Sequence, residues 1–115
     1  MKTKKILAID DDLQFIRSFK ERFAGLDFYN FTYALDGKEG LEKVIHGKPH
    51  IIILDLIMPK MDGLEFLKQL RSFDDQELAD TPVLIITRIG DTKKVAEVTP
   101  FGIRGYFVKS EMNFD

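Results

Sequence analysis

Short apolar runs alternate along the chain with segments of helical spacing. The run Ile51-Ile52-Ile53-Leu54 is typical of a buried strand in a parallel sheet, because four apolar residues are too few for a helix. Comparable runs predict strands near residues 5–9, 28–33, 51–54, 82–87 and 103–108. Strands that alternate with helices indicate an α/β fold with a parallel sheet and right-handed crossovers.

The segments between these strands place apolar residues on helical faces. The first face consists of Leu13, Ile16, Phe19 and Phe23, and Gly25 follows as its stop. Asp36 with Glu39 and Asp62 with Glu65 have the spacing of capping boxes, which mark helix starts. The residues expected to point inward from these two helices are Leu41, Val44 and Ile45, then Phe66, Leu67 and Leu70. Between Asp91 and Thr99 a weak helix is expected, which Pro100 should end early.

Charged and hydroxyl residues follow four of the predicted strands. The first strand runs into Asp10-Asp11-Asp12, the third into Asp55, the fourth into Thr87 and the fifth into Lys109. Because open α/β sheets place their ligands at the carboxyl ends of the strands, these side chains should converge on one edge of the sheet.

Clustered carboxylates repel one another unless a cation lies among them or their pKa values rise. Magnesium suits such a site, since it prefers oxygen ligands and is usually held by one or two carboxylates together with a substrate phosphate. Lys109 would supply a second positive charge.

With this set of residues, the chain resembles the receiver domain of two-component response regulators, and the resemblance extends from about Lys5 to Lys109. The residues that carry the resemblance are Asp10-Asp11, Asp55 within Leu54-Asp55-Leu56-Ile57-Met58-Pro59-Lys60-Met61-Asp62-Gly63, Thr87, Tyr106 and Lys109. Each residue alone is a weak signal, but the whole set, in order and at this spacing, is specific. The resemblance implies one receiver domain over residues 1–115, with a doubly wound five-stranded parallel sheet of flavodoxin-like order 2-1-3-4-5. It also implies that the final helix is missing or truncated, since residues 111–115 can only begin one.

The resemblance further implies a phosphorylatable switch. Asp55 would accept a phosphoryl group from the phosphohistidine of a sensor histidine kinase or phosphotransfer protein. Magnesium would be held directly by Asp11 and Asp55, through water by Asp10, and by the backbone carbonyl of Ile57. Such a domain is regulatory, catalysing only its own phosphorylation and dephosphorylation.

The output is also implied by the resemblance. Lys109 would pair with Asp55 at rest and with the phosphoryl group afterwards. Thr87 would then move toward the new oxygen and Tyr106 would turn inward. The surface that switches would lie around residues 88–106 and would contact an effector that the sequence does not identify.

Other protein classes fit the residues less well. A pseudo-receiver that binds partners without phosphorylation stays open because of Arg88 and Ser110, which stand where the family usually has a small residue and a proline. The intact site residues count against it, namely Asp10, Asp11, Asp55, Thr87 and Lys109. A phosphatase of the haloacid-dehalogenase type requires an acid two residues after the nucleophile, and that position is Ile57. A flavin- or nucleotide-binding protein requires a phosphate loop after the first strand, where three aspartates would repel phosphate.

Several residues also have plain structural interpretations. Asp12 has the position of a helix N-cap rather than of a metal ligand. Tyr106 could be a half-buried core residue, and Lys109 without the acids would be a solvated lysine. His46 and His50 are interpreted as surface residues.

Composition adds limits to this interpretation. The chain has 115 residues, of which 44% are hydrophobic, enough for one globular domain with a modest core. The net charge of -2 gives no whole-chain case for binding nucleic acid or an anionic membrane. No apolar run approaches the length of a membrane helix. Cys is absent, which is compatible with the cytoplasmic location we expect. A missing final helix would favour self-association through exposed apolar residues near Phe101, Phe107 and Phe114.

Overall fold

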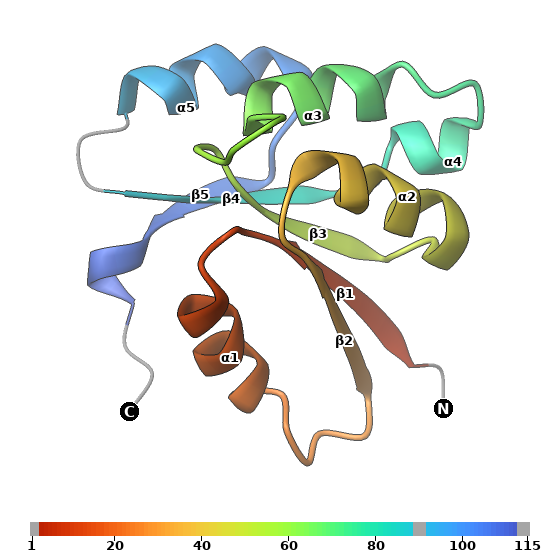
Figure 1. The fold of residues 1–115 in the computed structure, drawn as a ribbon. Coiled ribbons are helices and arrows are strands. Elements are labelled where there is room, and N and C mark those ends of the chain that lie inside the picture. The colour runs from red at the N-terminus through yellow and green to blue at the C-terminus, as the bar shows by residue number, and fades with distance from the viewer. Residues whose placement is uncertain (1–2, 89–91, 113–115) are drawn as a thin grey trace.

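The computed structural model describes residues 3–88 and 92–112, which form a five-stranded sheet with helices on both faces (Figure 1). The strands are β1 (Lys4–Ile9), β2 (Tyr29–Ala34), β3 (Ile51–Asp55), β4 (Val83–Thr87) and β5 (Gly105–Val108). The helices are α1 (Leu13–Glu21), α2 (Gly37–Gly47), α3 (Gly63–Arg71), α4 (Gln76–Ala79) and α5 (Thr92–Val98), with 3-10 turns η1 (Thr99–Phe101) and η2 (Lys109–Glu111).

The strand order is β2-β1-β3-β4-β5 and every pairing is parallel. This confirms the doubly wound, flavodoxin-like sheet expected from the resemblance. Each predicted strand is present, displaced by at most a residue or two at its ends. From β1 the chain adds β2 on one side of the sheet and then β3, β4 and β5 on the other side. The order of strand addition therefore reverses between β1 and β3. Open sheets place ligands at such a point.

The two faces of the sheet are covered unequally. Helices α2, α3 and α5 pack on one face, whereas α1 lies alone on the other (Figure 1). Alternate residues of the strands point to opposite faces, so Leu7 and Ile52 enter the larger core while Ile6 and Ile53 enter the smaller one. The α1 face consequently has a small buried core that is completed by half-buried aromatic residues.

An apolar groove of about 390 Å³ lies beside α1, which we call the open face. Its lining residues are Ile6, Phe19, Phe23, Tyr29, Ile51, Ile53, Leu84, Ile86, Phe107 and Met112. Among the residues that the structure describes after β5, only η2 forms, and Phe107 is 49% exposed. The five α-helices include α4, a single turn before β4, and no α-helix follows β5 within residues 109–112. Phe114 lies outside the described residues.

Capping explains where the helices begin. The side chains of Asp12, Asp36 and Asp62 each accept a hydrogen bond from a backbone N–H three residues later. This confirms the predicted starts and the structural role of Asp12. Helix α5 ends at Val98 and Pro100 lies in η1, as the sequence predicted.

Some side chains do not lie where the spacing placed them. Ile45 was expected to point inward but is 49% exposed, because α2 buries only a narrow stripe that includes Leu41 and Val44. On α1, Leu13 is exposed, whereas Phe15 is half-buried with Phe19. The short helix α4 was not predicted, since it is a single turn that depends on its Asp75 cap.

Arg71 holds the amino-terminal edge of β4 and β5 in place. Its guanidinium donates hydrogen bonds of 2.7–2.8 Å to four backbone carbonyls, those of Ala79, Thr81, Phe101 and Gly102. These bonds tie the end of α3 to the two segments that enter β4 and β5. Among the described residues, no helix is long and apolar enough to cross a membrane.

Candidate functional site

Three strand ends bring the predicted acids and lysine together. Asp10 follows Ile9, which pairs with Leu54, so Asp10 lies beside Asp55 at the end of β3. Lys109 directly follows β5. Asp10 and Asp55 are 2% and 1% exposed, so two carboxylates are almost fully removed from water at this edge.

Lys109 lies between the two buried acids. Its Nζ is 2.8 Å from Asp10 Oδ2 and 3.6 Å from Asp55 Oδ2. The ammonium is therefore nearer to Asp10 than to Asp55, the partner that the resemblance implied. Neither contact is a hydrogen bond, and within the described residues none of these three atoms has a hydrogen-bond partner. Lys109 is therefore held to the two acids by charge attraction and not by directional hydrogen bonds.

The acids have a geometry that suits a metal ion. One oxygen from each of Asp10, Asp11 and Asp55 lies within 4.8 Å of the others, and Asp11 is exposed to solvent. Asp10 Oδ1 accepts a hydrogen bond from the Asp12 N–H at 2.9 Å, and Asp55 Oδ1 accepts one from the Ile57 N–H at 3.4 Å. The other oxygens of Asp10 and Asp55 are left for charged partners. These three carboxylates are an oxygen donor set that fits a hard divalent cation.

Burial changes the acidity of Asp55. Desolvation by burial and, after it, the neighbouring charge of Asp10 together raise the pKa of Asp55 to about 7, although Lys109 opposes the shift. Ionising Asp55 in the absence of a cation therefore costs free energy in the folded state. Anything that binds there with positive charge will favour the carboxylate form.

The loop after β3 is shaped by close backbone packing. Gly63 donates its N–H to the Leu56 carbonyl at 2.9 Å. A Cβ on Gly63 would lie 2.8 Å from Leu56 Cα and 3.0 Å from the Asp55 carbonyl oxygen. Only glycine allows α3 to sit this close to the strand end that carries Asp55. The sequence placed Gly63 only at the end of the segment that follows Asp55, so its role in positioning Asp55 was not predicted.

Thr87 and Tyr106 occupy different environments. Thr87 is buried at the end of β4, and its Oγ1 donates a hydrogen bond to the Arg88 carbonyl at 3.3 Å. Tyr106 is 50% exposed on the edge strand β5.

Arg88 is exposed, and the described residues include no ion pair between it and Asp55. Part of the expected switching surface, residues 89–91, lies outside the described residues.

Ser110 and the two histidines have modest structural roles. Ser110 lies in η2, and the described residues contain no cis peptide bond, which agrees with serine replacing proline after Lys109. His46 and His50 are exposed, as predicted. His50 Nδ1 accepts the Lys5 N–H at 2.9 Å, a partner that the sequence did not indicate.

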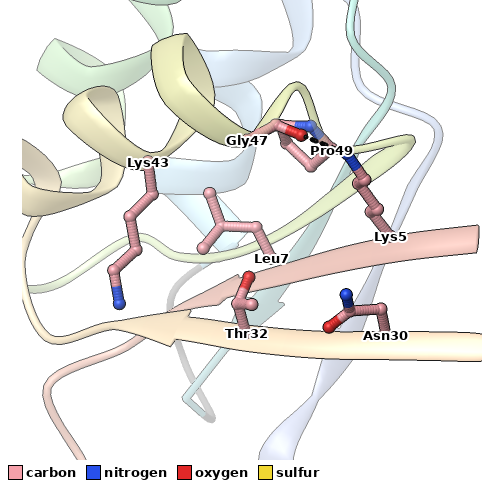
Figure 2. Close-up of a pocket in the computed structure, with 7 residues that line it drawn as sticks. All are labelled: Lys5, Leu7, Asn30, Thr32, Lys43, Gly47 and Pro49. Carbon is pink, nitrogen blue, oxygen red and sulfur yellow. Dashed lines mark hydrogen bonds between the residues drawn. The ribbon is translucent and has the colours of Figure 1, made fainter.

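A cavity of about 160 Å³ lies apart from the acidic site, between α2 and strands β1 and β2 (Figure 2). Its two cations already have partners. Lys5 Nζ donates to the Gly47 carbonyl at 3.1 Å, while Lys43 pairs with Glu39 at 3.3 Å and donates to the Tyr33 carbonyl. Both lysines of this cavity are therefore already paired, whereas the buried charged atoms without hydrogen-bond partners in the described part of the chain lie at the strand ends.

The fold and the site together define a doubly wound α/β protein with an acidic, lysine-paired centre at its switch point. The family model described as "Response regulator receiver domain" matches residues 6–113. The chain belongs to the family of response regulator receiver domains. Receiver domains are the regulatory phosphoacceptor domains of two-component systems, and this membership sets aside the phosphatase and flavin-binding alternatives.

Similar proteins support the assignment. The chain is 35% identical over 108 residues to the chemotaxis protein CheY-3 of Vibrio cholerae, covering 94% of this chain and 82% of that protein. It is 33% identical over 108 residues to the probable C4-dicarboxylate response regulator DctR of Halalkalibacterium halodurans, covering 91% of this chain but 44% of the relative. The solved structure of the chemotaxis response regulator CheY4 of Vibrio cholerae superposes with a TM-score of 0.84 at 30% identity, covering 98% of this chain and 91% of that one.

The raised pKa of Asp55 predicts a pH-dependent stability in metal-free buffer. Between about pH 4 and pH 7 the folded state holds a proton on Asp55 that the unfolded state has released, so stability should fall as pH rises. Asp55→Asn removes this titration and should melt several degrees higher than the wild type at pH 7.5, with the difference shrinking toward pH 4. Thermal melts in EDTA across this range measure the effect.

The control is Asp27→Asn, which removes an exposed aspartate and should leave the profile unchanged. A less stable Asp55→Asn protein at pH 7.5 would contradict the prediction, because it would mean that Lys109 over-compensates the burial of the carboxylate.

Proposed function

We propose that this receiver domain is a phosphorylatable switch in which Asp55 takes a phosphoryl group from the phosphohistidine of a sensor histidine kinase or phosphotransfer protein. The observation that carries the proposal is the burial of Asp55 at the strand end, beside two further acids and 3.6 Å from Lys109. Receiver domains bind Mg²⁺ through acidic residues, and the reaction proposed here depends on that ion.

The chemical step requires little from the protein beyond placement and charge. An Asp55 carboxylate oxygen attacks phosphorus, a P–O bond forms, and the P–N bond breaks with its electron pair passing to the imidazole. Asp11 and Asp55 would hold Mg²⁺ directly, Asp10 through water, and the carbonyl of Ile57 would be a further ligand. The ion would supply positive charge to the phosphoryl oxygens and would favour ionised Asp55.

Lys109 and Thr87 complete the proposed site. Lys109 already lies within reach of both acids, so a small displacement from Asp10 would bring it to a phosphoryl group on Asp55. The Thr87 hydroxyl would turn toward the new oxygen, and Tyr106 would leave its half-exposed position. The altered surface around residues 88–106 would then be read by an effector. Dephosphorylation by water would reset the switch.

A pseudo-receiver remains the second candidate, because Arg88 and Ser110 depart from the usual pattern. The exposure of Arg88 and its lack of an ion pair to Asp55 among the described residues favour the phosphorylatable switch.

Partners follow from the relatives only in outline. The chain spans 44% of the length of DctR and 34% of the response regulator MprA of Mycobacterium leprae, so the activity of any longer protein is part of the proposal. The open face provides a further surface. Its continuous apolar lining would support self-association between two copies of the chain.

Phosphorylation is the first test of the proposal. Incubated with acetyl phosphate and Mg²⁺, the wild-type protein should gain one phosphoryl group by intact mass. Asp55→Asn should gain none, because an amide oxygen is too weak a nucleophile. EDTA should also prevent labelling. Equal labelling of the wild type and Asp55→Asn would place the phosphorylation site elsewhere.

Arg88 sets the second test. If its side chain narrows the approach to Asp55, Arg88→Ala should speed labelling by small phosphodonors. We expect an increase in rate of about two- to fivefold, which is what an interaction energy of an exposed charged side chain corresponds to. Slower labelling or a shorter phosphorylated lifetime would instead show that the guanidinium holds the phosphoryl group. Unchanged rates would show that Arg88 points to solvent and has no part in the reaction.

The open face sets the third test. Sedimentation velocity across a wide range of concentrations should show reversible association of the wild type. Phe107→Ser should weaken it, because Phe107 is half-exposed at the groove. Ile45→Ser is the matched control, since Ile45 is equally exposed but lies on α2, which packs on the opposite face of the sheet. A strictly monomeric wild type would refute association through this face.

A further inference from the structure

Four residues around the acidic site form a closed circuit of contacts. Asp10 Oδ1 accepts the Asp12 N–H, and Asp12 Oδ1 accepts the Phe15 N–H at 3.2 Å. The ring of Phe15 lies beneath Lys109, with Nζ 4.7 Å from its centroid. Lys109 Nζ then returns to Asp10 Oδ2 at 2.8 Å. The N-cap of α1 and the placement of the active-site lysine are therefore linked through one aromatic ring.

The ring matters because little else directs the lysine. Lys109 Nζ is buried, and its side chain is 15% exposed. It has no hydrogen-bond partner among the described residues, so charge attraction alone would leave its direction loose. A cation within about 6 Å of an aromatic centroid is attracted by the electron-rich face of the ring, and more strongly when water is excluded. Phe15 thus supplies a contact to the ammonium in addition to the two acids.

Phe15 is itself held firmly. Its backbone N–H is bonded to the cap, and its ring packs against Phe19 at 5.8 Å between centroids. Phe19 in turn contacts Phe23 at 5.5 Å and Phe31 at 5.8 Å. The platform under Lys109 is one end of an aromatic cluster that fills the space between α1 and β2.

We propose that Phe15 is a positioning residue for the phosphorylation reaction, holding Lys109 over its ring so that the ammonium faces Asp10 and Asp55. This inference rests on the proposed function, because it assigns Phe15 a role in the reaction at Asp55. Without the ring, the long Lys109 side chain would turn toward solvent more often. Its ammonium would then be less often in place to stabilise the negative charge that develops on the phosphoryl group.

The test changes the electron density of the ring while nearly keeping its size. A trifluorinated phenylalanine at position 15 weakens attraction for a cation but packs much as phenylalanine does. Labelling of this variant by acetyl phosphate with Mg²⁺ should be roughly two- to tenfold slower than that of the wild type. Phe15→Tyr, which keeps an electron-rich ring, should stay close to the wild-type rate. The matched control carries the same fluorinated residue at position 19, one turn further from the site, and should label normally.

A second measurement is independent of phosphorylation. The ring current of Phe15 should displace the NMR resonances of the Lys109 side-chain methylenes, and Phe15→Leu should return them toward ordinary lysine values. Phe19→Leu should leave them nearly unchanged.

The outcomes separate the two proposals. An unlabelled wild type overturns the proposed function, whereas the Lys109 resonances still report whether the ring holds the lysine. Equal labelling rates for the fluorinated position 15 and the wild type overturn the role of Phe15, even if the resonances are displaced. Resonances that do not respond to Phe15→Leu overturn it as well.

Discussion

Two carboxylates that are nearly removed from water face a single ammonium at the carboxyl edge of the sheet, and the rest of the site depends on this imbalance. Asp10 and Asp55 are fixed by adjacent strands and cannot separate, while Lys109 neutralises at most one of them. Burial first, and then the charge of Asp10, raise the pKa of Asp55, and one oxygen of each acid has no hydrogen-bond partner in the described part of the chain. A divalent cation, alone or together with a phosphoryl group, would neutralise the carboxylate charge that Lys109 leaves unpaired. The site is therefore prepared to respond to ligands by a redistribution of charge.

The scaffold serves this arrangement at several points. Parallel register brings the strand ends level, and Gly63 allows α3 to pack closely behind Asp55. The Asp12 cap connects the loop that carries Asp10 to α1, whose aromatic face lies under Lys109 and extends to the open face. The acidic site and the apolar groove thus share one helix. A partner seated in the groove would contact the same aromatic cluster whose Phe15 ring contacts Lys109.

Much of this was predictable from the sequence, for physical reasons that also explain the failures. Apolar runs ending in polar residues located Asp10, Asp55, Thr87 and Lys109, because a parallel sheet forces its strand ends together. The strand order required the family resemblance, since periodicity contains no information on neighbours. Helix α4 was missed because a single capped turn has no periodicity, and Ile45 was misplaced because α2 buries a narrow stripe. Phe15 was overlooked although Phe15, Phe19 and Phe23 recur at intervals of four, a second stripe that the spacing of Leu13 and Ile16 obscured.

The central claim is that the buried Asp55, and not the exposed Asp11 beside it, is the phosphoacceptor. Reducing the phosphorylated protein with borohydride converts an aspartyl phosphate to homoserine, and tandem mass spectrometry then identifies the modified position. The account predicts homoserine at position 55 alone. Homoserine at position 10 or 11, or a phosphoryl group that resists reduction, would contradict it.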